Sequence, residues 1–239
     1  MSAFGGLTDH FGLATGDMVL VDSEKTPIAQ NRADAQDENG DIVASAYFGN
    51  TSGDFAEVSC TYAIKSGNVN LNTLKCGEVV VGTAPNDVRI IITSIEVSTS
   101  NDGWPQVTVS GTAGAFQVCT VPGKLNTYTL PAVSIAGCKR AQPIGFTVTE
   151  GRLTSSSLSA SVEIAQQEDG VGEPVAHAVS GGTKEVSAEF VRITAPPEWQ
   201  ITTPGIGLVE TQKPGVSEGQ SAWHTSTATA AGTLERDDA

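Results

Sequence analysis

The chain has 239 residues, 39% of them hydrophobic and 17% charged, and its 26 glycines and 11 prolines indicate many turns between short strands. That charged fraction is too low for an intrinsically disordered chain, and the length suits one large β domain or two small ones. The 13 basic and 27 acidic residues give a net charge of −14, which disfavours ordinary binding to DNA or RNA by neutralisation of phosphates.

The first residues predict an arm rather than part of a folded domain. Residues 1–15 are rich in glycine and contain Asp9 and His10, and no cationic segment is followed by an apolar run, so no secretory signal is expected. No stretch approaches the roughly 20 apolar residues that a membrane helix needs. We therefore expect a soluble chain that starts out in a cytoplasm and has no membrane partner.

Residues 26–37 are the best candidate for a helix, with Thr26 as N-cap and Pro27 at the first helical position, but they suit an extended arm equally well. The run DAQDENGD at residues 34–41 resembles a calcium loop. Counted from Asp37, however, Ile42 and Phe48 occupy the positions where an EF-hand requires glycine and glutamate. An acidic turn is therefore favoured, and a weak cation site is the alternative.

Alternation with period two, together with β-branched residues, predicts strands through the middle of the chain. Residues 89–98 and 106–112 predict a hairpin, because Asn101, Asp102 and Gly103 between them tolerate the positive φ angles of a tight connection. Weaker patterns predict further strands at residues 17–21, 41–48, 56–63, 78–81, 128–135 and 145–149.

A second, longer hairpin is predicted over residues 153–193, with a polar link at residues 166–182. In both of its strands apolar side chains alternate with serine or glutamate, so one face is apolar and the other carries hydroxyl groups and acids. The polar face comprises Ser157, Ser159, Ser161 and Glu163 on the first strand, and Glu185, Ser187 and Glu189 on the second. A solvent-exposed face is the simplest interpretation, and the wall of a water-filled channel is the alternative.

Beyond this hairpin, residues 196–239 form a proline-interrupted extension that contains Trp199 and Trp223. Such a tail either lies across its own domain or reaches onto a neighbour. Together the patterns predict an all-β, mainly antiparallel fold. We expect a β-sandwich or barrel-like domain over residues 16–195, with a long hairpin, at most one short helix and extended N- and C-terminal arms.

The residue types that usually bind metals show no recognisable constellation. The three histidines are far apart and have no cysteine or carboxylate at metal-ligand spacing. The four cysteines show no CxxC spacing; buried free thiols are favoured, with disulfides or a metal site as alternatives. The histidines are His10, His177 and His224, and the cysteines are Cys60, Cys76, Cys119 and Cys138.

Catalytic motifs are equally absent from the sequence. It contains neither a phosphate-binding GxxxxGK[ST] loop nor a GxSxG nucleophile turn. Glu163 and Glu185 are candidates to face one another across the long hairpin, but a glycosidase also needs aromatic platforms, and aromatic residues make up only 5% of the chain. We therefore expect no enzymatic activity, no catalytic or metal-binding residue and no cofactor.

Three segments carry a resemblance to a known family. They are FAEVSCTYA at residues 55–63, IIITSIEVSTSNDGWPQVTVSG at residues 90–111, and residues 157–193 with the link EDGVGEPVAHAVSGG. In these segments, and in its short N-terminal arm, all-β body and extended end, the chain resembles tail-tube proteins and related virion structural proteins of tailed phages and prophages. The resemblance spans most of residues 15–195.

The resemblance implies a subunit that assembles with copies of itself into stacked rings, commonly of six, whose sheets complete an inner barrel. The polar face of the long hairpin would then line a negative lumen through which viral DNA passes without specific binding. The segments 1–15 and 166–182 would be stacking contacts, and the candidate inter-subunit residues are Trp199, Trp223, Glu173 and Pro174. The protein would belong to the virion tail, beside other tail proteins, after assembly in the host bacterial cytoplasm.

One departure from the family and three other classes of function stay open. Members of the family usually pack a helix on their sheet, which only residues 26–37 are candidates to supply. Another virion component, such as a capsid decoration or head–tail joining protein, would share this composition but differ in symmetry. A β-sandwich binding module would show an aromatic or loop-built site, and an enzyme would have to form its active site at a subunit interface.

Overall fold

The computed structural model describes residues 7–28, 31–48, 55–81, 89–114, 117–119, 127–130, 133–144, 152–170, 174–192, 199–202, 209–212, 217–218, 224–234 and 236–237. Every regular element in these ranges is a β-strand. The predicted all-β class is therefore confirmed. Among these residues no helix of the length and apolar character needed to span a membrane is found.

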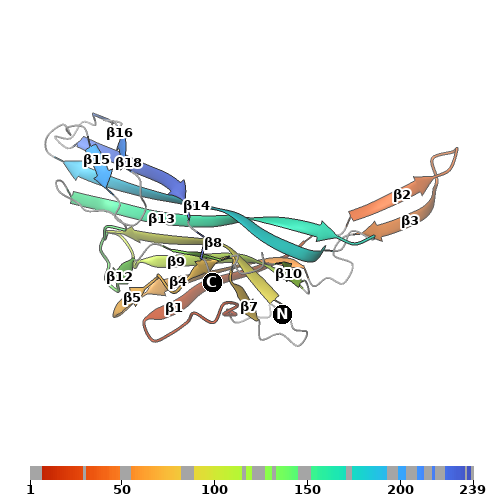
Figure 1. Ribbon diagram of the computed structural model, residues 1–239, viewed down its shortest axis with the longest axis horizontal. Helices are drawn as coiled ribbons and strands as arrows, with labels where there is room; N and C mark the ends of the chain where they lie inside the picture. Colours follow the sequence, from red (N-terminus) through yellow and green to blue (C-terminus); the bar gives the residue numbers. More distant parts are fainter. Residues whose placement is uncertain are drawn as a thin grey trace, which may run out of the picture.

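A main sheet of ten strands runs along the body of the molecule (Figure 1). Eight of the strands follow one another across it in the order β1 (Met18–Pro27), β4 (Ala56–Ile64), β9 (Gln106–Gly114), β8 (Arg89–Ser100), β13 (Arg152–Glu168), β14 (Pro174–Arg192), β18 (His224–Thr233) and β17 (Ser217–Glu218). The other two are β7 (Val79–Val81), which pairs with β8, and β10 (Gln117–Cys119), which pairs with β14. Only the pairing of β10 with β14 is parallel among the described strand pairs, so the antiparallel prediction is also confirmed.

Shorter strands form four separate pairs. β5 (Asn68–Asn70) pairs with β12 (Ser134–Ala136), and β6 (Lys75–Cys76) pairs with β11 (Tyr128–Thr129). The remaining pairs are β15 (Trp199–Thr202) with β16 (Val209–Gln212), and β2 (Asn31–Gln36) with β3 (Ile42–Phe48). Figure 1 shows β2 and β3 extending away from the body at one end of its long axis.

The core lies on one face of the main sheet, because apolar side chains occupy alternate positions of its strands. Leu158 of β13, for example, lies opposite Val97 of β8 and Val186 of β14, and all three are buried. The segments around β5, β6, β11 and β12 add further buried side chains to the same cluster, namely Leu71, Leu74, Leu130, Ile135 and Ile144. Each large apolar side chain that is fully buried in this way stabilises the fold by about 1.5–3 kcal/mol.

Most of the expected strands are present. Those expected at residues 17–21, 41–48, 56–63, 78–81, 89–98 and 106–112 correspond to β1, β3, β4, β7, β8 and β9. The strand expected at residues 128–135 is divided into β11 and β12. The one expected at residues 145–149 lies outside the described residues.

The long hairpin is more regular than its sequence suggests, and the polar link expected at residues 166–182 is wrong. β13 and β14 pair through most of that segment, with Gln166 opposite His177. His177 and Val179 are buried at alternate positions, as a strand requires. Gly181 adopts φ +60°, a conformation that glycine tolerates and that permits the β-bulge in β14 where the register with β13 shifts.

The helix considered for residues 26–37 is also wrong, because the segment contains the end of β1 and all of β2. β3 is rich in β-branched and aromatic residues and gives β2 a pairing partner. The acidic turn between the two strands is confirmed. Asp37 Oδ1 accepts the backbone N–H groups of Asn39 and Asp41, each at 2.9 Å, and Gly40 has φ +86°.

Two aspartates fasten segments near both ends of the described chain to the body. Asp9 accepts hydrogen bonds from the Tyr62 hydroxyl at 2.5 Å and from the backbone N–H groups of residues 12–14. Burial alone would raise the pKa of Asp9, but these hydrogen bonds outweigh it and hold the pKa below its ordinary value. Asp237 is held in a comparable way, with Lys75 Nζ 3.0 Å from its carboxylate.

Candidate functional site

The face of the main sheet that points away from the core carries hydroxyl and carboxylate groups. Its side chains lie in cross-strand rows, because paired residues of neighbouring strands point to the same side. One row contains Asp22, Thr61, Thr108, Glu96, Ser159 and Glu185, the next contains Glu24, Ser59, Ser110, Ser94, Ser161 and Thr183, and a shorter third row contains Gln106, Ser98, Ser157 and Ser187. None of these residues is buried, and together they are referred to as the hydroxyl–acid face.

Neighbouring hydroxyl groups on this face bond to one another across the strands. The hydroxyl oxygens of Thr61 and Thr108 are 3.1 Å apart, and those of Ser161 and Thr183 are 2.9 Å apart. A hydroxyl has one proton and two lone pairs, so each of these groups keeps hydrogen-bonding capacity for water. The hydroxyl–acid face is therefore a hydrated surface.

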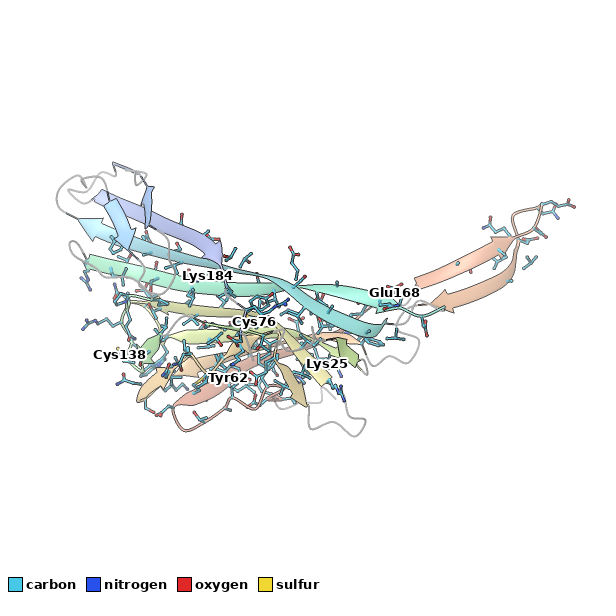
Figure 2. The ribbon with its side chains drawn as sticks, viewed as in Figure 1. Lys25, Tyr62, Cys76, Cys138, Glu168 and Lys184 are labelled. Carbon is cyan, nitrogen blue, oxygen red and sulfur yellow. The ribbon has the colours of Figure 1, made fainter. Side chains whose placement is uncertain are left out.

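The charged groups of the hydroxyl–acid face are all acidic, namely Asp22, Glu24, Glu96 and Glu185. Lys184, which precedes Glu185 in the chain, points to the other side of the sheet and is only 7% exposed (Figure 2). Strand alternation thus separates this base from the acids. A surface whose charges have one sign builds up a potential, and this one repels phosphates and other anions.

The seven side chains predicted for a channel wall all belong to this side of β13 and β14, where they alternate with residues that pack against the core. Ser159, Ser161, Glu163 and Glu185 are exposed, and Ser157, Ser187 and Glu189 are half-exposed. The structure therefore brings these residues together on one surface. Whether that surface lines a channel stays a prediction.

Glu163 and Glu185 do not face one another, so that expectation is wrong. Glu185 lies opposite Ser159, and Glu163 lies opposite Ser180, beyond the bulge in β14. The register of the hairpin therefore places the two carboxylates in different rows. Their arrangement does not provide the opposed acid pair of a glycosidase.

The candidate inter-subunit residues are only partly described. Trp199 opens β15 and Pro174 opens β14, while Trp223 and Glu173 lie outside the described residues. Within residues 196–239, which the sequence predicts as an extension, β18 pairs with β14 from Thr183 to Arg192. This part of the chain consequently contributes a strand to the main sheet.

Sequence reasoning found only the part of the hydroxyl–acid face that lies on the long hairpin. The contributions of β1, β4, β8 and β9 were missed, although Ser94, Glu96 and Ser98 alternate with buried residues just as the serines of β13 do. That alternation is the signal from which each strand's polar side can be found. The order and register that join the strands into one face depend on contacts between distant segments.

Thiols and histidines supply no reactive site in the described part of the chain. Cys60 and Cys76 are buried free thiols, and Cys138 is a half-exposed one, while the side chain of Cys119 is not described. Burial raises the pKa of Cys76 to about 12, so this thiol stays protonated at neutral pH. Within the described ranges no three His, Cys, Asp or Glu side chains are grouped closely enough to hold a metal ion.

Two depressions on the exposed side of the sheet are lined mainly by residues with polar side chains. One lies between Trp104, Gln106 and Ser157, and the other between Glu57 and Ser110. Neither has the predominantly apolar lining that small-molecule pockets usually have. No protein-family model and no curated protein matches the chain.

Proposed function

We propose that this protein is a structural subunit of a phage-type tail tube, which assembles with copies of itself into rings whose hydroxyl–acid faces line a channel for DNA. The observation that carries the proposal is the face itself. Neighbouring strands from β1 to β14 present hydroxyls and carboxylates in consecutive rows that contain no basic side chain. A broad surface of hydroxyl and acidic groups without cations suits the wall of a channel through which DNA must move.

The physical role of such a wall is to keep DNA from adhering. Proteins hold DNA chiefly by placing Lys and Arg against its phosphates, and the rows of the face contain neither residue. Two like unit charges 10 Å apart in water repel by about 0.4 kcal/mol. Repeated around a ring, these small repulsions keep phosphates off the wall, while the hydroxyl groups hold water in the gap.

The edges of the main sheet provide a way for neighbouring subunits to join. β1 and β17 are the outermost strands along the described sheet. An outermost strand leaves backbone N–H and C=O groups on one side available for pairing with another chain. Pairing of the β1 edge of one copy with the opposite edge of the next would continue the rows of the hydroxyl–acid face around a ring.

Electron microscopy of the purified protein tests this assembly. We expect rings or tubes about 100 Å across, which is the size of a symmetric ring of domains of this length. Averaged end-on images should show six-fold symmetry. Trimeric or twelve-fold particles would favour another virion component instead. A monodisperse monomer that binds sugars would contradict the proposal and favour a binding module.

The channel wall itself is tested by Ser157→Lys, Ser159→Lys and Ser161→Lys together. These side chains do not contribute to the core, so the triple variant should fold and assemble but should impair DNA passage, because the new cations hold phosphates. The matched control places three lysines at Asn68, Thr73 and Ser134, which are exposed outside the face. Full activity of the first variant in a phage-infectivity assay would count against the lumen assignment.

A further inference from the structure

The β2–β3 hairpin stands apart from the body of the molecule. It projects from one end of the body (Figure 1), and every residue from 33 to 45 is exposed. β2 and β3 pair with each other and with no other described strand. A lone two-stranded hairpin is at best marginally stable in water, so we expect this one to gain stability from a partner.

The surface of the β2–β3 hairpin is both acidic and apolar. Ile42 is 51% exposed and Val43 is 64% exposed, and both lie at the turn end of β3, where the register with β2 shifts. The acids on and beside the turn are Asp34, Asp37, Glu38 and Asp41, all of them exposed. A partner surface therefore needs positive charge and a place for apolar side chains.

The opposite end of the body carries a positive cluster. Lys139, Arg140 and Arg152 are exposed there, and they are referred to as the basic end. Asn101 draws their segments together, since its Oδ1 accepts the N–H of Ala141 at 3.0 Å and its Nδ2 donates to the carbonyl of Leu153 at 2.9 Å. In Figure 2 the neighbouring Cys138 lies at the end of the body away from β2 and β3.

An apolar surface accompanies these charges. Lys139 Nζ lies 5.4 Å from the centroid of the Trp104 ring, and this indole is half-exposed. Asp102 is the acidic residue in the same turn, so the cluster keeps a net positive charge. In a chain of net charge −14, a local positive cluster beside an aromatic ring is complementary to the β2–β3 hairpin.

We propose that the β2–β3 hairpin of one copy docks on the basic end of a second copy, in a head-to-tail contact between carboxylates and cations around Trp104. The two surfaces lie at opposite ends of the same molecule, so a hairpin does not reach its own basic end (Figures 1 and 2). Each copy in such a chain offers one hairpin and one basic end. A contact between two different surfaces propagates from copy to copy and gives closed rings or filaments.

This contact does not rest on the hydroxyl–acid face, and the two proposals can fail separately. The β2–β3 hairpin and the three cations of the basic end are not members of its rows, although Trp104 lines a depression together with Gln106 and Ser157 of the third row. Substitution of the docking surfaces should abolish head-to-tail assembly and leave the chemistry of the face unchanged. Ser159→Lys with Ser161→Lys, which leaves Ser157 beside Trp104 unchanged, should have the opposite result, with normal assembly and impaired DNA passage.

Charge reversal with sedimentation velocity over a range of protein concentrations tests the contact. Lys139→Glu with Arg140→Glu, and separately Glu38→Lys with Asp41→Lys, should each weaken self-association about tenfold or more. Glu38 and Asp41 are substituted rather than Asp37, because the Asp37 carboxylate stabilises the turn through hydrogen bonds to the backbone. Arg89→Glu, compared with Arg140→Glu alone, is the control, since the two single variants change the net charge equally at exposed sites and Arg89 lies on β8, outside the basic end and away from both outermost strands.

The decisive variant combines both reversals. If hairpin and basic end meet, the exchanged charges attract again and association returns to near its original strength. Failure of the combined variant to recover, or equal weakening by the control, would overturn the assignment of the basic end as the docking site. A wild-type protein that stays monomeric at every concentration would overturn the contact altogether. Far-UV circular dichroism of each variant shows that loss of association is not loss of folding.

Discussion

Tyr62→Phe removes one hydroxyl from the contact that holds residues 7–14 on the body. The Tyr62 side chain is fully buried, and its hydroxyl donates to Asp9 Oδ1 at 2.5 Å. A hydrogen bond to a charged group contributes about 1.5–3 kcal/mol to stability. Asp9 is half-exposed and keeps its backbone donors, so we expect the free energy of unfolding to fall by about 1–2 kcal/mol at pH 7.

The pH dependence of that loss identifies its cause. The pKa of Asp9 in the folded protein lies below its ordinary value of 3.8. A group of this kind stabilises the fold fully above its unfolded pKa, and its contribution is lost as the pH falls through the lowered value. The stabilities of Tyr62→Phe and the wild type should therefore differ at pH 7 and converge at a pH well below 3.8.

Urea unfolding followed by tryptophan fluorescence measures the difference, and hydrogen exchange at residues 12–14 reports the local release of the segment. Tyr128→Phe is the matched control, because Tyr128 is 5% exposed and its hydroxyl makes no hydrogen bond to another described residue. Equal stability of Tyr62→Phe and the wild type at pH 7 would refute the reasoning. So would a difference that persists unchanged at low pH, since the charge of Asp9 could not then be its source.

Two further predictions concern the core. Gly182→Ala should destabilise the protein by about 1–3 kcal/mol, because an added Cβ would lie 2.6 Å from a ring carbon of Tyr128, whereas Gly16→Ala, with no atom within 4 Å of its Cβ, should leave thermal unfolding unchanged. A thiol reagent should modify the half-exposed Cys138 in the folded protein and should spare Cys76, whose pKa burial raises to about 12, until denaturant is added. Mass spectrometry of the labelled peptides checks the second prediction, and fast labelling of Cys76 without denaturant would contradict its burial.

Alternation of buried and exposed positions is the reason that the second half of β8, β9 and most of β13 are predictable from sequence. In these strands a local window contains the whole signal, as at Leu158 and Ala160 between their serines. The distal part of the long hairpin lacks that clarity, because Gly181 and the polar residues around it also suit a loop. What makes it a strand is the bulge and the pairing with β10, a segment far away in the chain.

The polar face shows the same division between local and distant information. The serines of β13 are recognisable from their spacing, but the row that joins Ser159 to Glu96 and then to Thr108 depends on registers set by core packing. The β2–β3 hairpin was missed for a related reason. Thr26 and Pro27 are local helix-start residues, while the partner strand that decides the outcome follows the turn at Asp37.

Alternation along a strand also assigns architecture and surface chemistry to different residues. In β13 the buried Leu158 and Ala160 hold the sheet to the core, while Ser157 and Ser159 between them face the other way. Substitutions in the second set therefore leave the first undisturbed, so the surface is free to evolve in charge and bulk while the fold is inherited unchanged. The same separation means that a designer can change the exposed surface by substituting every second residue of these strands.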